Sequence, residues 1–365
     1  MEDIRVLVVD DSVAIRKIVT DLLNETDGMR VIGTASNGEI ALKRIEELNP
    51  DIVTLDIEMP VMSGLEALPE IQKLRPQMPV VVFSAQTEQG AVATLDALSL
   101  GASDYVTKPS NAGSPEEAAE SIQTSLIPKI ESLCVRSGAL EARLEKKIAT
   151  TRAPTQTEAA STAPRRIDLV AIGISTGGPN ALGAMLPELP ADLPVPIVIV
   201  QHMPPKFTDH LARRLDGECK INVREGESGV KLEPGSCWIA PGGLHMVVER
   251  HRNELVLDLN EAPPENHCRP AVDVLFRSVA EALGPRSLGV MMTGMGQDGL
   301  LGCEVLRERG SQVIVQDEAS STVWSMPGVV AKAGLAVETL PLDRIASAIN
   351  RRSAIGRTQL TKAEG

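Results

Sequence analysis

Apolar and polar residues alternate in short blocks from residue 4 to about residue 130. Five of these blocks are apolar and rich in β-branched residues, at 4–9, 31–35, 51–55, 79–84 and 104–108. Amphipathic segments lie between them, for example at 13–24, 38–48, 64–74 and 88–98. Nearly continuous apolar strands that alternate with helices are typical of a parallel sheet covered on both faces. The pattern predicts a small, doubly wound α/β domain with five parallel strands.

A second α/β pattern begins at about residue 167. Apolar runs occur at 168–172, 196–200, 288–292 and 312–315. Helices are predicted at 179–187, 206–215, 271–283, 299–309 and 341–352. In the middle, "GSCWIAPGGLHMVVE" and "ELVLDL" look like antiparallel strands with a Pro-Gly-Gly turn. We therefore expect a second doubly wound α/β domain, Rossmann-like in its alternation, with a β-hairpin insertion.

The segment between these two patterns has a different composition. Residues 131–166 are first charged and then rich in Thr, Ala and Pro, and apolar periodicity stops after Ile148. Such composition is typical of a linker. The predicted organisation is a first domain at 1–125, a linker at 126–166, a second domain at 167–353 and a tail at 354–365.

Composition narrows the class of protein. The 365 residues are enough for two domains, and 43% of them are hydrophobic, so each domain can bury a core. The net charge of −13 argues against a nucleic-acid partner, because phosphate contacts need clustered Lys and Arg. No apolar run approaches the length of a membrane span, and the N-terminus has no signal-peptide pattern. Five cysteines without C-x-x-C spacing suggest free thiols in the cytoplasm.

Polar residues gather at the predicted strand ends of the first domain. Asp10 and Asp11 close the first strand, Asp56 the third, Ser84 the fourth and Lys108 the fifth. Carboxyl ends of parallel strands share one edge, where ligands bind. Three carboxylates repel one another unless a cation neutralises them, and Mg²⁺ suits oxygen ligands. A single Asp at a strand end is more often a helix cap, but the set of five favours phosphoryl transfer to a carboxylate.

Residues 1–125 resemble a two-component receiver domain, because "VVDDS", "TLDIEMP", "SA" and "TKP" stand where that family has them. The resemblance implies a flavodoxin-like fold and phosphorylation of Asp56 by a sensor histidine kinase. It also implies Mg²⁺ held by Asp10 or Asp11, or both, by Asp56 and by the backbone carbonyl of Glu58.

The same resemblance assigns a phosphate switch. Ser84 and Tyr105 match the pair that reorients on phosphorylation, and Lys108 matches the lysine that contacts the phosphate. Tyr105 also has a simpler interpretation as a half-exposed strand aromatic. It is the only tyrosine in the chain.

The second domain opens on "LVAIGISTGGPNAL", in which Ser175 lies in the pattern G-x-S-x-G-G between a strand and a helix. A dinucleotide fingerprint would need a glycine at the position of Ser175, and the expected acidic residue falls at Asp192, in a Pro-rich loop. A nucleophile turn fits better, since the sharp turn exposes the hydroxyl and the helix N-terminus can stabilise an oxyanion.

A serine nucleophile needs a base and an orienting acid. His202 ends the next apolar strand, in "IVIVQHMP", and Asp298 lies in "TGMGQDG" after another strand. Taken alone, His202 is more often structural, and Asp298 could simply cap the helix at 299–309. Their common location at the sheet edge of Ser175 favours a Ser-His-Asp triad and a hydrolase.

Residues 167–353 resemble the catalytic domain of the chemotaxis protein-glutamate methylesterases. The matching stretches are "IGISTGGP", "QHMP", "APGG-HM", "RPAVDVLF", "TGMGQDG" and "SMPG". Small departures are "GIS", where many members have "GAS", and the residue before Met in "WSMPG". Neither changes a triad residue.

This second resemblance implies individual roles. Ser175 would be the nucleophile, His202 the general base and then acid, and Asp298 its orienting partner. The backbone N–H of Met295 would help to form the oxyanion hole, and Thr176 would support the histidine. No cofactor is expected for the esterase.

The two resemblances together predict a phosphorylation-activated esterase. It would remove methyl groups from glutamate methyl esters of chemoreceptors and deamidate receptor glutamines. The unphosphorylated first domain would cover the active-site edge. Three rivals are a switched binding protein with an inactive second domain, a nucleotide-dependent oxidoreductase and a transcription regulator. The first should lack a triad residue, the second needs an acidic ribose contact and the third a basic recognition helix; we find none of these signs.

Overall fold

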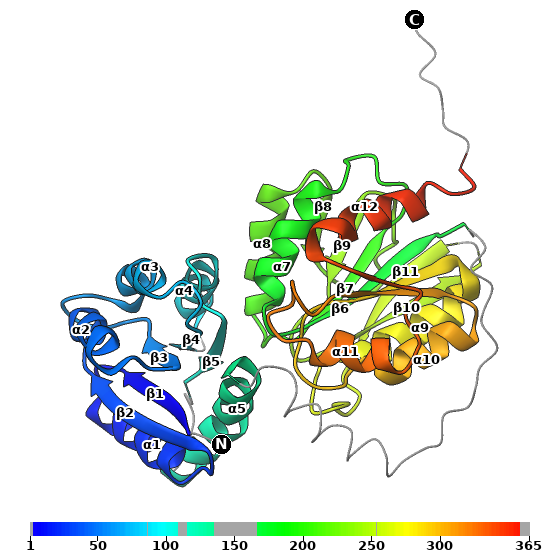
Figure 1. Ribbon diagram of the computed structural model, residues 1–365. Helices are drawn as coiled ribbons and strands as arrows, with labels where there is room; N and C mark the ends of the chain where they lie inside the picture. The colour runs from blue at the N-terminus through cyan, green and yellow to red at the C-terminus, as the bar shows by residue number, and fades with distance from the viewer. Residues whose placement is uncertain (1–2, 86, 109–114, 135–165, 253, 358–365) are drawn as a thin grey trace, which may run out of the picture. The chain divides into compact units, whose positions relative to one another are not determined.

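The computed structural model describes residues 3–85, 87–108, 115–134, 166–252 and 254–357 (Figure 1). Most of the predicted linker at 126–166 and the end of the tail at 354–365 lie outside the described residues. The chain divides into two compact units, Met1–Ala153 and Pro154–Gly365. Each unit is described by itself.

The first unit is built on a five-stranded parallel sheet in the order β2-β1-β3-β4-β5. Its strands are β1 (Ile4–Val9), β2 (Met29–Ala35), β3 (Ile52–Asp56), β4 (Val80–Ser84) and β5 (Asp104–Thr107). The chain reverses its direction of winding between β1 and β3, which places a crevice at their carboxyl ends. The predicted fold of this domain is confirmed.

Helices cover both faces of this sheet: α1 (Val13–Asn24), α2 (Gly38–Leu48), α3 (Gly64–Leu74), α4 (Glu88–Ser99) and α5 (Pro115–Cys134). Helices α1 and α5 pack together on one face, whereas α2, α3 and α4 follow one another on the other (Figure 1). Local signals start them: the Ser63 hydroxyl accepts from the N–H of Glu66, whose carboxylate accepts from Ser63, a complete capping box.

The second unit contains a seven-stranded parallel sheet in the order β14-β13-β12-β6-β7-β9-β8. Its strands are β6 (Leu169–Ile174), β7 (Ile197–Gln201), β8 (Asn222–Glu225), β9 (Ser236–Ile239), β12 (Ser287–Met291), β13 (Gln312–Gln316) and β14 (Glu338–Leu340). Strand β6 is central, with β7 on one side and β12 on the other. The winding therefore reverses at β6, and a ligand crevice is expected at its carboxyl end.

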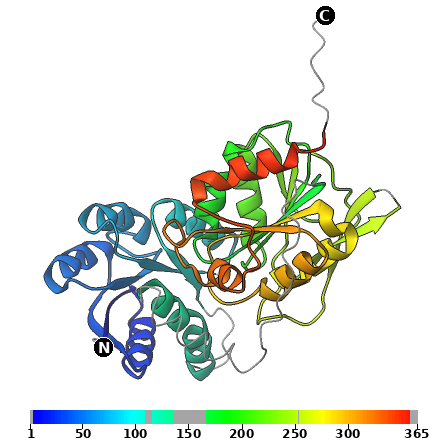
Figure 2. The same ribbon diagram turned by 45° about the vertical axis from the view of Figure 1, so that its right-hand side comes forward.

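Helices flank this sheet on both faces: α7 (Gly178–Met185), α8 (Phe207–Glu218), α9 (Val272–Leu283), α10 (Leu300–Glu308), α11 (Ser325–Lys332) and α12 (Leu342–Ser353), with short 3₁₀ turns at Leu186–Glu188 and Gly284–Arg286. Helices α7, α8 and α12 form one layer, and α9, α10 and α11 form the other (Figures 1 and 2). The doubly wound prediction is confirmed.

The hairpin insertion is confirmed as β10 (His245–His251) paired antiparallel with β11 (Glu254–Asn260). The expectation that "GSCWIAPGGLHMVVE" forms strands of one antiparallel element was wrong in part. Its first strand, β9, pairs in parallel with β7 and joins the main sheet. Residues Ser236–Ile239 alternate half-buried and buried side chains, as a strand of a covered sheet does. The Pro-Gly-Gly segment therefore connects the main sheet to the hairpin and is not the turn of the hairpin.

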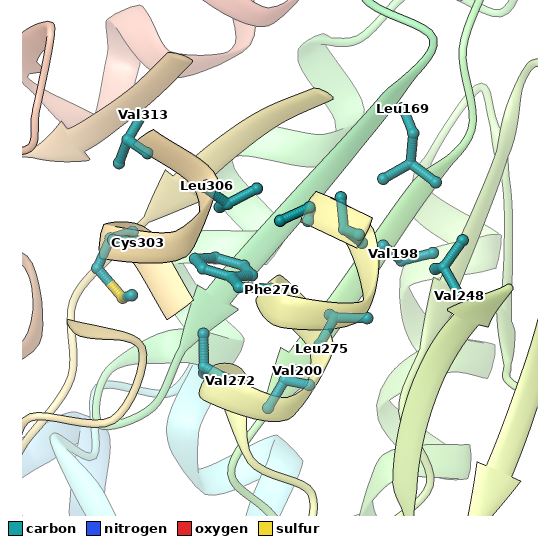
Figure 3. Close-up of a cluster of buried hydrophobic side chains, with 14 of the residues drawn as sticks. Leu169, Val198, Val200, Val248, Val272, Leu275, Phe276, Cys303, Leu306 and Val313 are labelled. Carbon is teal, nitrogen blue, oxygen red and sulfur yellow. The ribbon is translucent and has the colours of Figure 1, made fainter. Parts of the chain in front are cut away.

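The core of the second unit lies between the sheet and helices α9 and α10. Figure 3 shows Phe276 of α9 among Leu306 of α10, Leu275 and Val200. The close approach of the two helices depends on Gly302, since a Cβ there would lie 2.6 Å from the Cβ of Phe276. With 2% aromatic residues in the chain, aliphatic side chains fill most of this core. Tight packing here fixes the start of α9, which matters for the site described below.

Helix α5 runs to Cys134 and so passes residue 125, at which the first domain is predicted to end. The boundary between domain and linker stays a prediction. Among the described residues, no helix is both long enough and apolar enough to cross a membrane.

Candidate functional sites

An acidic cluster lies at the carboxyl ends of β1 and β3. Asp10 and Asp56 are buried, and Asp11 is exposed beside them. One carboxylate oxygen from each of the three lies within 4.8 Å of the others. Lys108, after β5, places its Nζ 3.2 Å from Asp10 Oδ2 and 2.7 Å from Asp56 Oδ2. The structure thus brings together four of the five strand-end residues predicted from the sequence.

The cluster is incomplete without a further positive group. Asp10 Oδ2 and Asp56 Oδ2 are buried and have no hydrogen-bond partner among the described residues, although the Lys108 ammonium lies close to both. A single ammonium leaves excess negative charge in a buried place, which is costly. Hard divalent cations prefer such carboxylate oxygens. The donor set therefore fits Mg²⁺, as expected from a receiver-type acidic cluster.

The electrostatics of Asp56 follow from this arrangement. Burial raises the pKa of its carboxyl, the Lys108 ammonium lowers it, and the neighbouring Asp10 raises it again, to about 6 in total. The backbone N–H of Glu58 donates to Asp56 Oδ1 at 3.4 Å. Gly64 is needed for this corner, since a Cβ there would lie 2.1 Å from the Asp56 carbonyl oxygen. Asp56 is thus held at the crevice, with Oδ1 beside the Glu58 N–H and Oδ2 beside the Lys108 ammonium.

The predicted switch residues lie at the same edge. The Ser84 hydroxyl is buried and donates to the carbonyl of Gly90 at 3.0 Å, so it faces the start of α4. The ring of Tyr105 is buried rather than half-exposed, and Lys129 Nζ lies 5.1 Å from its centroid. Their reorientation on phosphorylation stays a prediction.

In the second unit, Ser175 directly follows the central strand β6. Its backbone N–H donates to the carbonyl of Thr293 at 3.0 Å, which ties the corner to the loop after β12. Gly177 has a φ of 76°, in the left-handed region that favours glycine. Gly294 lies so close that a Cβ there would be 2.9 Å from the Cβ of Ser175. The half-exposed serine is therefore placed on a sharp strand-to-helix turn, as the motif predicts.

His202 and Asp298 meet beside this corner. Residues Ile174 and Gln201 are the last register partners of β6 and β7, so Ser175 and His202 directly follow the ends of two neighbouring strands. The backbone N–H of His202 donates to the Ile174 carbonyl at 3.2 Å. His202 Nε2 lies 2.8 Å from Asp298 Oδ2, across 96 residues of sequence. A carboxylate only accepts, so Nε2 carries a proton, and Nδ1 is the ring nitrogen that can accept when the imidazole is neutral.

Asp298 is fully satisfied by hydrogen bonds. Besides His202, it accepts from the N–H groups of Val272 at 2.6 Å and Asp273 at 3.0 Å and from Asn266 Nδ2 at 3.0 Å. The two backbone donors belong to the first turn of α9, whose dipole also favours negative charge. The alternative that Asp298 caps α10 is wrong: the cap of α10 is Gly299, without a side-chain bond. A different helix holds this carboxylate.

Asn266 and Asp273 belong to this network and were missed by sequence reasoning. Asn266 Nδ2 bridges Asp273 Oδ2 at 2.9 Å and Asp298 Oδ1 at 3.0 Å. Burial raises the pKa of Asp273, and the nearby Asp298 raises it further, to about 6. The only signal in the sequence was their position around the matched stretch "RPAVDVLF", which by itself indicates a helix start.

His202 and Asp298 form an ion pair at neutral pH. Burial lowers the pKa of His202, but the hydrogen bonds of Asp298 and Cys268 raise it more, to about 10. Burial raises the pKa of Asp298, yet the imidazole and the backbone donors of α9 lower it below its ordinary value. A histidine held this strongly by a carboxylate is well oriented, but it must release a proton before it can act as a base.

The remaining predicted residues lie around Ser175. Met295 is half-buried in the Gly-rich turn, one residue after Gly294. Thr176 is buried and its carbonyl accepts from the Thr293 hydroxyl at 2.9 Å. Their roles, in the oxyanion hole and in support of the histidine, stay predictions.

Both units match models of known protein families. The family model for the CheB methylesterase matches residues 170–349, and that for the response regulator receiver domain matches residues 6–120. The catalytic domain of the CheB methylesterase of Thermotoga maritima superposes with a TM-score of 0.50 at 37% identity, covering 51% of this chain and 99% of that one.

Curated relatives match over the full length. A protein-glutamate methylesterase/protein-glutamine glutaminase of Trichodesmium erythraeum is 50% identical over 353 residues, which is 96% of this chain and 99% of the relative. One of the same name from Nocardioides sp. is 50% identical over 364 residues, 100% of this chain and 99% of the relative. The chain therefore belongs to the CheB family of protein-glutamate methylesterases/protein-glutamine glutaminases that carry a receiver domain.

Proposed function

We propose that this chain is a protein-glutamate methylesterase and protein-glutamine glutaminase in which Ser175 is the nucleophile. The Ser175 hydroxyl attacks the carbonyl of a glutamate methyl ester while His202 Nδ1 accepts its proton. Asp298 stabilises the resulting imidazolium through Nε2. The imidazolium returns the proton to the leaving methoxide, methanol departs, and water then hydrolyses the acyl-enzyme by the same steps. A glutamine side chain reacts in the same way and releases ammonia.

One observation carries this proposal most: the 2.8 Å bond between His202 Nε2 and Asp298 Oδ2 at the strand next to Ser175. Nδ1 is therefore the ring nitrogen that can act as the base once the imidazolium has released its second proton. We assign the oxyanion hole to the backbone N–H of Met295 and a supporting position to Thr176. Gly294, packed against Ser175, allows this loop to approach the nucleophile.

We further propose that phosphorylation of Asp56 controls the esterase. Asp10, Asp11, Asp56 and the carbonyl of Glu58 would hold Mg²⁺, which neutralises phosphate charge during transfer. Lys108, already 2.7 Å from Asp56 Oδ2, would then contact the phosphate oxygens. Ser84 and Tyr105 would reorient in response.

The partners follow from the two activities. A sensor histidine kinase would supply the phosphoryl group, and methylated chemoreceptors would be the substrate, so that the protein adapts chemotactic signalling. We place this activity in the cytoplasm, and the free state of all five cysteines is consistent with a reducing compartment.

The nucleophile is tested by Ser175→Ala in the full chain. Methanol release from methylated receptor membranes should fall by at least about 10⁴-fold, because attack and proton transfer both start at this hydroxyl. Phosphorylation by acetyl phosphate should be unchanged. Ser347→Ala, at an exposed serine of α12, serves as the control. Methanol release at a near-normal rate in Ser175→Ala would show that the nucleophile is wrongly assigned.

The control by phosphorylation is tested by Asp56→Asn. Acetyl phosphate with Mg²⁺ should stimulate methanol release in the parent protein and leave the variant at its basal rate. A normal response of the variant would place the acceptor elsewhere. The two variants are independent, since Ser175→Ala alters chemistry and Asp56→Asn alters its regulation.

A further inference from the structure

A cysteine that the proposed mechanism does not use lies against the catalytic histidine. Cys268 Sγ is 3.7 Å from His202 Nδ1, the ring nitrogen that Asp298 leaves free. Cys268 is half-buried, and the His202 side chain is 13% exposed. The thiol therefore faces the same lone pair that the Ser175 proton must reach.

The spacing of these two atoms matches that of two ligands on one metal ion. Tetrahedral zinc binds sulfur at about 2.3 Å and nitrogen at about 2.0 Å, which places the two ligand atoms about 3.5 Å apart. The opposite ring nitrogen of His202 donates to Asp298, as metal-binding histidines commonly donate to a carboxylate. One ligand atom from each of His202, Cys268 and Asp298 lies within 4.8 Å of the others.

The backbone holds Cys268 in this position. Glu265 and Cys268 pair across a tight turn, with N–H to carbonyl distances of 3.1 and 2.8 Å. The central residues of the turn, Asn266 and His267, have φ values of 51° and 63°. Asn266 is tied in turn to Asp298 by its side chain. The thiol is thus pre-positioned by the same network that orients the triad.

The two clusters in this chain differ in ligand chemistry. Asp10, Asp11 and Asp56 offer only oxygen, which suits Mg²⁺. His202 and Cys268 offer an imidazole nitrogen and a sulfur, which select zinc-like ions over Mg²⁺. The two sites should therefore respond to different metals.

We propose that His202 Nδ1 and Cys268 Sγ form a binding site for Zn²⁺, and that the bound ion turns the esterase off. The thiol and the Nδ1 of the imidazolium each lose a proton to solvent as sulfur and nitrogen coordinate the ion, and water fills the remaining positions. With its lone pair bound to metal, Nδ1 has no capacity to accept the Ser175 proton. A site with two protein ligands is open and reversible, unlike a closed structural site. The inhibition, but not the binding, rests on the proposed role of His202.

Binding is tested with Co²⁺, a coloured substitute for Zn²⁺, added to the full chain in saturating Mg²⁺. A thiolate-to-cobalt charge-transfer band in the near ultraviolet is expected in the parent protein. Cys268→Ser and His202→Gln should each abolish it. Cys219→Ser, which removes another half-buried thiol, should keep it. No band in the parent protein, or a band that survives in Cys268→Ser, would overturn the site.

Inhibition is tested by methanol release from the unphosphorylated chain at rising Zn²⁺. Each variant is compared with its own rate in a chelator, so a change in basal rate does not matter. Cys268→Ser and Cys268→Ala should raise the half-inhibiting concentration at least about tenfold, and Cys219→Ser should leave it unchanged. The chelator should restore activity, and Mg²⁺ should not inhibit.

The outcomes separate the two parts of the proposal. Equal inhibition of the parent protein and both Cys268 variants would refute regulation at this site. A cobalt band without inhibition would also refute regulation. If Ser175→Ala stays active while the cobalt band still depends on Cys268, the metal site stands and the proposed catalytic function fails.

Discussion

The two α/β units carry their candidate sites at the same topological position, but the carboxylates at the two sites differ in how they are satisfied. In each, the key residues follow the strands at which the winding of the sheet reverses, β1 and β3 in one and β6 in the other. Asp56 Oδ2 is buried without a hydrogen-bond partner among the described residues, whereas both oxygens of Asp298 accept two bonds each. The acidic cluster needs a group from outside the chain to balance its charge, whereas the chain itself supplies every partner of Asp298.

This difference explains why one site suits a switch and the other a catalyst. A buried carboxylate with unmet charge changes its energy strongly when a cation or phosphate arrives, so it can report that event. A carboxylate held by four donors is already organised for the transition state and gains little from rearrangement. Five experiments test this contrast, from the largest expected effect to the smallest.

Replacing Asp298 by Asn should have the largest effect. The amide cannot accept from His202, Asn266 and two backbone N–H groups together, so the imidazole loses its orientation and its counter-charge. Methanol release should fall by about 10³ to 10⁴-fold. The control is Asp168→Asn, which removes a carboxylate bound by three arginines at the opposite end of β6. Equal losses in the two variants would mean that Asp298 acts only through stability.

The esterase should gain activity as the pH rises. Only the neutral imidazole accepts a proton, and the pKa of His202 is raised, to about 10. Activity should therefore increase by up to about tenfold per pH unit through and above neutrality. The measurement is methanol release from pH 6 to 9, with Ser175→Ala as the blank for spontaneous hydrolysis. A plateau that is complete by pH 6.5 contradicts the raised pKa.

The contribution of sulfur to that pKa can be measured in the same assay. Because Cys268 is one of the groups that raise the pKa of His202, Cys268→Ser should shift the rise of activity between pH 6 and 9 to lower pH. Cys219→Ser should not move it.

In the first unit, Asp56→Asn should stabilise the fold at neutral pH. The pKa of Asp56 is raised from 3.8 to about 6 on folding. The free energy of unfolding therefore decreases as the pH rises through this range, because the buried carboxyl must ionise. The variant should gain about 2 kcal/mol in the free energy of unfolding above pH 6 and nothing below pH 3.8. Hydrogen exchange of peptides from β3 and β4 measures the stability of the first unit independently of the second. Saturating Mg²⁺ should shrink the gain.

Asn266→Ala should have the smallest effect. It removes the bridge between Asp273 and Asp298 and leaves the other donors of Asp298 in place. We expect a loss of about tenfold in methanol release, because one of the four donors to the Asp298 carboxylate is lost and three remain. Asn260→Ala, at the end of β11, is the matched control. An unchanged rate in Asn266→Ala would show that the backbone of α9 orients Asp298 without help.

Much of the fold could be predicted because its signals are local. The helices at 38–48 and 64–74 begin and end where the amphipathic pattern does. Three elements were not predicted from the sequence: the edge strands β8 and β14, and helix α11. The two strands have four and three residues, and their side chains are mostly polar or half-buried. Helix α11 carries Pro327 in its first turn and lies in a segment with little amphipathic contrast. Edge strands bury too few side chains to show a hydrophobic pattern.

The sequence by itself determined the alternation of strands and helices, the motifs at the strand ends and hence the family. Each of these features depends on residues that are close together in the sequence. Only the tertiary structure decided that Asp298 is held by α9 rather than by α10, that Asn266 bridges two carboxylates, and that Cys268 faces His202. Those contacts join segments that are far apart in sequence, and their geometry depends on how the sheet and helices pack.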